Sequence, residues 1–220
     1  MKTAAVFGAT GLIGTHLVQL LCNSNEYGKV YSFARRKPEN QPEKVEYIDF
    51  LTDLLKIPND VDTVFVCLGT TIKKAGTQEA FLKIDYDMVV EIAKQSKLSN
   101  VKRFIVVSSI GANPNTNNFY LQTKGRMEEA VKQLQIDYCG IVRPSLLFGN
   151  RIEFRFGERV AIALFKIFSF IFVGPLKKYK GIYAEDVAKG MIMLARSEMG
   201  NVTIESNIIK QLADEYTKQQ

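Results

Sequence analysis

The stretch Ala4-Ala-Val-Phe-Gly-Ala-Thr-Gly-Leu-Ile-Gly14 decides the expected fold of this 220-residue chain. A short apolar run opens at Ala4, and Gly8, Gly11 and Gly14 then follow at three-residue intervals. From the second glycine onward, apolar residues recur at helical spacing, namely Leu12, Ile13, Leu17, Val18, Leu20 and Leu21. The pattern predicts a buried strand, a tight glycine turn and a helix that begins at Leu12.

Each glycine of this turn has its own physical role. The first permits the tight turn, the second lets a pyrophosphate approach the backbone, and the third lets the helix pack closely on its strand. The beginning of the helix supplies unpaired N–H groups and a positive dipole potential. We therefore expect the turn to bind a dinucleotide; the alternative is a glycine-rich turn needed only for close packing.

The rest of the chain alternates between apolar runs rich in Val, Ile and Phe and helical stretches. Strands are expected at Lys29–Ala34, Lys44–Ile48, Thr63–Leu68, Arg103–Ser108 and Tyr138–Val142, and helices at Leu12–Cys22, Gln78–Lys97 and Phe119–Gln135. This alternation predicts an α/β fold, a doubly wound parallel sheet of the Rossmann type in three αβα layers. We expect one domain over residues 1–220, with the ligand crevice beyond the carboxyl ends of the strands.

Residues 150–180 break this rhythm and are expected to form a helical insertion that covers the cleft. Its apolar helix, Val160–Val173, is shorter than the roughly 20 residues that a membrane-spanning helix needs, and Lys166 lies in its middle. A cover for the substrate cleft, or an interface to a second copy or a protein partner, is preferred over peripheral membrane contact. A helix at Ile182–Ala195, an edge strand at Val202–Glu205 and a closing helix at Ser206–Tyr216 are expected after it.

Charge and cysteine content exclude several classes of protein. The net charge of +6 comes from scattered cations rather than a long basic run with interleaved aromatic residues, so we expect no nucleic-acid partner. Cys22, Cys67 and Cys139 lie in apolar segments without ligand spacing, and His16 is the only histidine, so no metal site is expected. Buried free thiols and the absence of a charged-then-apolar leader predict a cytoplasmic protein without a signal peptide.

Charged residues at two strand ends bear on the choice of dinucleotide. Arg35 and Arg36 follow the second strand, where an acidic residue would accept the ribose 2′-hydroxyl of NAD. Paired guanidinium groups fit a 2′-phosphate instead, so we expect NADP(H); the alternative is a solvated basic loop. Asp49, at the end of the third strand, could accept a hydrogen bond from the adenine amino group or cap a short helix. The small residues around Leu68 and Gly69, at the end of the fourth strand, would let the ribose and pyrophosphate lie close to the backbone.

A proton-transfer device is expected beside the fifth strand. That strand ends at Ser108 and Ser109, and Tyr120 and Lys124 follow on one face of a predicted helix. A lysine cation beside a phenol favours the phenolate form, and a serine hydroxyl can hold a carbonyl or alcohol oxygen. Strand neighbours point to opposite sides, so either serine could face the substrate, and Ser109 is preferred. The three groups suit hydride chemistry on a C–O bond.

With these motifs in place, the chain resembles the atypical short-chain dehydrogenase/reductases, and among them the Tat-interacting protein-like oxidoreductases. The resemblance runs from Val6 to about Leu194. It is carried by the glycine turn, by Ser108-Ser-Ile-Gly-Ala-Asn-Pro-Asn-Thr-Asn-Asn-Phe-Tyr-Leu-Gln-Thr-Lys-Gly-Arg-Met-Glu128 and by Arg143-Pro-Ser-Leu-Leu147. The short distance from serine to tyrosine and the lack of a large C-terminal domain argue against a bulky nucleotide-sugar substrate.

The resemblance implies a role for each matching residue. The pyrophosphate would be held by Gly8, Thr10, Gly11, Leu12 and Ile13, the 2′-phosphate by Arg35 and Arg36, and the adenosine side by Leu68 and Gly69. Asp49 stays a cofactor candidate from its place at the strand end. Ser109, Tyr120 and Lys124 would be the catalytic residues. Ser108, Tyr120 and Lys124 would also line the cofactor, with Lys124 on the nicotinamide ribose and Pro144 and Ser145 beside the nicotinamide.

These expectations combine into one functional hypothesis. The protein would be an NADPH-dependent oxidoreductase that reduces a small carbonyl compound, in a pocket completed by Phe148, residues 150–156 and the apolar helix. Two alternatives stay open: an NADPH-binding regulator that acts through a protein partner without catalysis, and an NAD(P)-dependent epimerase or dehydratase.

Overall fold

A parallel sheet forms the centre of the molecule in the computed structural model, which describes residues 1–35, 37, 42–49, 55–149, 179–198 and 200–220. Within these residues the sheet has seven strands in the order β3-β2-β1-β4-β5-β6-β9, and all neighbours are parallel. The strands are β1 Lys2–Phe7, β2 Tyr27–Ala34, β3 Val45–Asp49, β4 Thr63–Val66, β5 Arg103–Val107, β6 Tyr138–Arg143 and β9 Val202–Glu205. The order reverses at β1, where a doubly wound sheet opens its ligand crevice.

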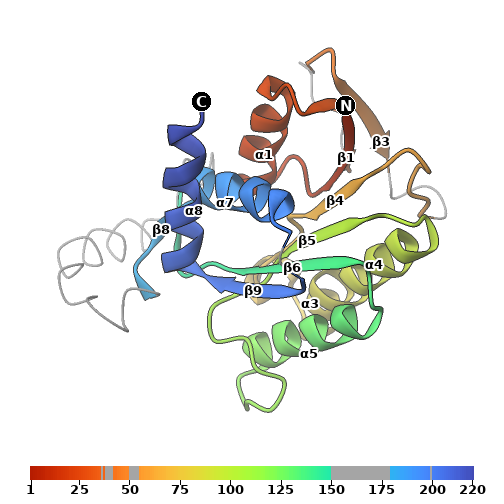
Figure 1. Cartoon of the computed structure of the whole chain (residues 1–220). Helices are drawn as coiled ribbons and strands as arrows, with labels where there is room; N and C mark the ends of the chain where they lie inside the picture. The colour runs from red at the N-terminus through yellow and green to blue at the C-terminus, as the bar shows by residue number, and fades with distance from the viewer. Residues whose placement is uncertain (36, 38–41, 50–54, 150–178, 199) are drawn as a thin grey trace.

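Helices cover both faces of the sheet (Figure 1). One face carries α1 Leu12–Asn23, α7 Ala184–Arg196 and α8 Ser206–Lys218; the other carries α3 Gln78–Leu82, η1 Lys83–Asp87, α4 Met88–Leu98 and α5 Phe119–Gln133. Alternate residues of β1 enter the two cores, since Ala4 and Val6 pack with the first group of helices, while Ala5 and Phe7 pack with the second. The expected three-layer Rossmann fold is confirmed.

The expected elements match the observed ones within a few residues, with three differences. The helix expected at Gln78–Lys97 contains the π-helical turn η1, which hydrophobic spacing does not reveal. The helix expected from Ile182 begins at Ala184, because Ile182 pairs in parallel with Leu147 and donates its N–H to the Leu146 carbonyl at 2.9 Å. The small strands β7 Leu147–Phe148 and β8 Ile182–Tyr183 and the short helix α2 Ile72–Ala75 were not expected.

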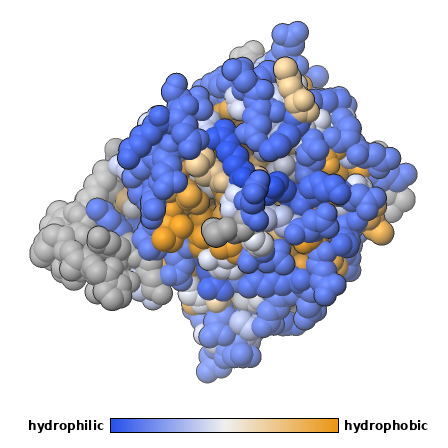
Figure 2. All heavy atoms as spheres, in the orientation of Figure 1, coloured by the Kyte–Doolittle hydropathy of each residue, from blue (hydrophilic) through white to orange (hydrophobic). Residues whose placement is uncertain are grey.

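Several expected features lie outside the described residues. These are Arg36, the apolar helix at 160–173 and most of the insertion at 150–180. None of the described helices is long and apolar enough to cross a membrane. Figure 2 shows a largely hydrophilic face with a hydrophobic patch over the beginning of α8, where Ile208 is exposed.

Candidate functional site

The glycine turn between β1 and α1 has the geometry that the three glycines were expected to provide. Gly8 adopts a φ of 77°, and a Cβ there would lie 2.9 Å from the Cys67 carbonyl carbon. The Gly11 N–H donates to the Gly8 carbonyl at 2.9 Å and closes the turn. A Cβ on Gly14 would lie 2.2 Å from the same carbonyl oxygen, so only glycine lets α1 pack this closely on the turn.

The first turn of α1 is open for an anion. The helix begins after Gly11, which has an extended conformation and no side-chain cap. The backbone N–H groups of Leu12 and Ile13 therefore belong to the part of the helix that has no internal acceptor. The Thr10 side chain is exposed, Leu12 is half-buried, and the Ile13 side chain packs into the core. Ile13 can therefore contact a phosphate only through its backbone N–H group.

The ends of β2 and β3 lie side by side at the carboxyl edge of the sheet, where the adenosine is expected. Ala34 is the register partner of Asp49, and the Tyr47 hydroxyl donates to the Ala34 carbonyl at 3.0 Å. Arg35 follows directly and is exposed. The Arg35 guanidinium and the Asp49 carboxylate thus lie at the end of the second strand. The guanidinium is suited to bind a phosphate, and the carboxylate is suited to accept a hydrogen bond from an amino group.

The end of β4 lies between the glycine turn and α5. Burial raises the pKa of the Cys67 thiol to about 12, so this thiol stays protonated and is no nucleophile at neutral pH. Leu68 packs against the core, and Gly69 is exposed. A Cβ on Gly69 would lie 3.9 Å from the Lys124 Nζ atom. The expected adenosine side therefore lies next to Lys124, one of the two residues expected to transfer protons.

The two serines after β5 have different surroundings. Ser108 is buried, and its hydroxyl donates to the Glu128 carboxylate at 2.5 Å. Arg143, at the end of β6, donates to both oxygens of the same carboxylate at 2.8 and 2.6 Å, and the pKa of the Arg143 guanidinium is raised mainly by this hydrogen bonding. Ser109 is half-buried, and its hydroxyl lies 3.3 Å from the Ile110 carbonyl. The Ser108 hydroxyl is therefore part of a structural network that joins β5, α5 and β6.

Tyr120 and Lys124 lie one helical turn apart on α5, as expected. The Tyr120 ring is half-buried and lies 5.6 Å from the ring of Phe81 on α3. The Lys124 side chain is 4% exposed, and its Nζ atom lies 2.7 Å from an oxygen of Asp85. A phenol and an ammonium group are thus held on the same helix face beside the end of β4.

Two residues beside the candidate site were not predicted from the sequence. Asp85 is fully buried in η1. Hydrophobic spacing does not predict this burial, because a carboxylate within a helical pattern is expected to face solvent. Gly125 follows Lys124, and a Cβ there would lie 2.3 Å from the Pro114 nitrogen. This glycine lets the loop that follows Ser109 pack directly on α5 beside the tyrosine and the lysine.

The end of β6 closes the other side of the site. Pro144 is buried, and its carbonyl accepts the Ile110 N–H at 3.0 Å. The Ser145 N–H donates to the Ser206 hydroxyl at 2.7 Å, which ties this loop to the beginning of α8. Phe148, expected to line the substrate pocket, is buried and lies edge-on to Tyr183 with a ring distance of 5.6 Å.

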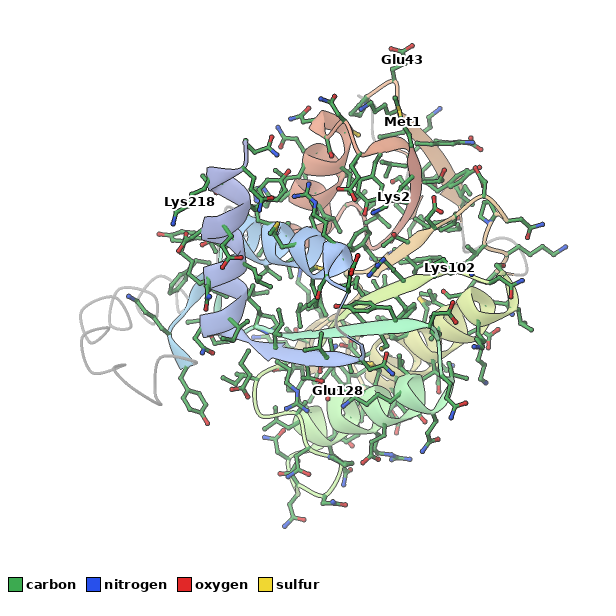
Figure 3. All side chains as sticks on the ribbon, viewed as in Figure 1. Met1, Lys2, Glu43, Lys102, Glu128 and Lys218 are labelled. Atoms are coloured by element: carbon green, nitrogen blue, oxygen red, sulfur yellow. The ribbon has the colours of Figure 1, made fainter. Side chains whose placement is uncertain are left out.

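The opposite, amino-terminal edge of the sheet carries a cavity of about 440 Å³. Lys2 and Lys102, both labelled in Figure 3, belong to its lining. Lys2 pairs with Glu26 at 2.6 Å and Lys102 with Asp137 at 3.6 Å, so these charges already have partners.

In the described residues no group of three or more His, Cys, Asp and Glu side chains could hold a metal ion.

The fold and the glycine turn define a nucleotide-binding protein of the Rossmann type. An NAD(P)H-binding family model matches residues 8–159, and the chain belongs to that family. "Protein FMP52, mitochondrial" from Meyerozyma guilliermondii is 31% identical over 225 residues, which cover 97% of this chain and 96% of the relative. "Protein HTATIP2" from Rattus norvegicus is 34% identical over 171 residues, covering 74% and 70%, which confirms the expected resemblance to Tat-interacting protein.

Solved structures support the fold alone. MoeE5 in complex with UDP-glucose and NAD aligns with a TM-score of 0.67 at 17% identity, over 99% of this chain and 82% of the other.

The names of the FMP52 relatives correct one expectation. They are described as mitochondrial in several yeasts, so the expected cytoplasmic location is wrong. Buried thiols indicate reducing surroundings or simple inaccessibility to oxidants, and they do not identify a compartment.

Proposed function

We propose that this chain is an NADPH-dependent oxidoreductase that reduces a small carbonyl substrate. The observation that carries the proposal is the placement of Tyr120 and the buried Lys124 on one face of α5, beside Gly69 at the carboxyl edge of the sheet. The uncapped beginning of α1 opens on this same edge. A phosphate track and a proton donor are thus combined in one site.

The residues divide the chemistry between them. When bound, the reduced nicotinamide supplies a hydride to the carbonyl carbon. Tyr120 donates its phenolic proton to the carbonyl oxygen, so that an alcohol forms and a phenolate remains. The Lys124 ammonium group stabilises that phenolate, and the Ser109 hydroxyl orients the carbonyl oxygen. Ser109 is chosen over Ser108 because the Ser108 hydroxyl is already bonded to Glu128.

The reaction is tested with purified protein, NADPH and a panel of small aldehydes and ketones, with 4-nitrobenzaldehyde as the first probe. We expect NADPH to be consumed in a one-to-one ratio with the alcohol formed, measured by absorbance and by mass spectrometry of the product. Tight NADPH binding without consumption by any carbonyl compound would instead favour the non-catalytic regulator.

Preference for the phosphorylated cofactor is tested by replacing Arg35 and Arg36 together by alanine. NADPH affinity should fall about 10- to 100-fold, because hydrogen bonds to a charged group contribute about 1.5–3 kcal/mol, while NADH affinity should change less than about twofold. Fluorescence titration with both cofactors measures this. Lys132→Ala, which removes an exposed cation from α5, is the control for general charge loss. Equal losses for both cofactors would contradict the 2′-phosphate assignment.

We further propose a mitochondrial location, on the strength of the FMP52 names. The segment at 160–173 stays a proposed cover of the substrate cleft or contact to a second copy or protein partner, and it lies outside the described residues.

A further inference from the structure

The helix that packs against α5 carries two fully buried residues one turn apart, Phe81 and Asp85, both 0% exposed. Phe81 lies on α3, and Asp85 lies in the π-helical turn η1, which continues directly from it. Single π-helical turns inside helices are frequent at functional sites. The residues of this turn are therefore candidates for a role in the site on α5.

The two helices meet through matching pairs of residues. Phe81 contacts the Tyr120 ring at 5.6 Å, and one turn further along both helices Asp85 contacts Lys124 at 2.7 Å. The aromatic contact fixes the position of the phenol ring. The charged contact is an ion pair by distance, without the directional geometry of a hydrogen bond. Each of the two proton-transfer residues thus has its own partner on the neighbouring helix.

Asp85 also contacts the strand edge where the cofactor is expected. Its second carboxylate oxygen accepts the Thr70 N–H at 2.9 Å. A Cβ on the neighbouring Gly69 would lie 3.5 Å from the first oxygen. One carboxylate therefore joins the loop after β4 to the ammonium group of α5.

A buried carboxylate is costly unless it is paired and hydrogen-bonded, and both conditions are met here. Two apolar side chains of similar volume would stabilise the fold as well as the Asp85–Lys124 pair does, because buried ion pairs add little net stability. The arrangement instead fixes the charge and the position of Lys124 beside Gly69.

We propose that Asp85 is the positioning residue of this site: it holds the Lys124 ammonium group in place and couples it to the Gly69–Thr70 loop. The inference rests on the proposed function for its catalytic consequence, but its consequence for NADPH binding does not require turnover. Lys124 fixed in this way can meet the nicotinamide ribose and the tyrosine phenolate from one position.

The test uses Asp85→Asn, which keeps an oxygen acceptor for the Thr70 N–H and removes only the negative charge. We expect NADPH affinity to fall about tenfold and kcat for 4-nitrobenzaldehyde to fall about 100-fold, with KM for the aldehyde within about twofold of the unmodified protein. The control is Asp87→Asn, an exposed carboxylate of the same turn, which should leave all three values unchanged.

A second background separates positioning from a structural effect. In Lys124→Met protein, adding Asp85→Asn should cause no further loss of NADPH affinity, because Asp85 acts through the lysine. An unchanged affinity in Asp85→Asn alone, or equal losses in both backgrounds, would overturn the proposal. If Asp85→Asn does not fold, NADPH affinity is compared between Lys124→Met and the double variant Lys124→Met/Asp85→Asn. Equal NADPH affinity of the two proteins supports the proposal. A weaker NADPH affinity of the double variant overturns it. Absence of aldehyde reduction in the unmodified protein would count against the proposed function alone.

Discussion

Replacement of Tyr120 by phenylalanine is expected to lower carbonyl turnover by about 10²- to 10⁴-fold, the usual contribution of a positioned general acid. The phenylalanine keeps the ring and its contact with Phe81, which is at 5.6 Å in the unmodified protein, so the helix packing should be preserved. The change removes only the hydroxyl that would protonate the substrate oxygen. NADPH affinity should therefore change by less than about threefold, since the proposed cofactor contacts of Lys124 and the glycine turn are retained.

Steady-state kinetics with NADPH and a reducible aldehyde, together with fluorescence titration, measure both effects. The control is Tyr216→Phe on α8, a buried tyrosine whose ring lies 5.3 Å from the Arg196 guanidinium, remote from the site. It should retain full turnover. A Tyr120→Phe protein with normal turnover would show that the proton comes from another group and that the catalytic assignment is wrong.

Replacement of Gly14 by alanine is expected to have the largest effect on folding. Its Cβ would lie 2.2 Å from the Gly8 carbonyl oxygen and 2.9 Å from the Ala9 Cα, and both neighbours are backbone atoms that cannot rotate away. The helix would have to move off the turn, at a cost of about 3 kcal/mol or more. That is a large part of the stability of an ordinary domain.

Chemical denaturation measures the change in the free energy of unfolding. Gly200→Ala is the matched control, because no described atom lies within 4 Å of its Cβ position, and its stability should change by less than about 0.5 kcal/mol. A Gly14→Ala protein as stable as the control would mean that α1 and the turn do not pack as closely as described. Where the variant folds, NADPH binding should be weakened, since the amide groups at the beginning of α1 would be displaced.

Much of the fold could be predicted from the sequence because its signals are local. Gly8, Gly11 and Gly14 are each required by backbone geometry within one turn, and unbroken apolar strands are typical of a sheet that is covered on both faces. Tyr120 and Lys124 share a helix face by spacing alone. The location could not be obtained in this way, because burial of thiols reports accessibility and not compartment.

Other features depend on contacts between segments far apart in the chain. The sequence left Ser108 and Ser109 open, and the Ser108 contact with Glu128 and Arg143 distinguishes them. Gly125 carries no visible signal, because its requirement comes from the approach of Pro114.

The sequence by itself determined the glycine turn, the order of strands and helices along the chain, and the shared helix face of Tyr120 and Lys124, because backbone sterics and periodicity act over a few neighbouring residues. Only the tertiary structure decided that Asp85 is buried 2.7 Å from Lys124 and bonded to Thr70. The reason is physical: a carboxylate becomes stable inside a protein only through partners on other elements, and those partners are brought together by packing across the sheet.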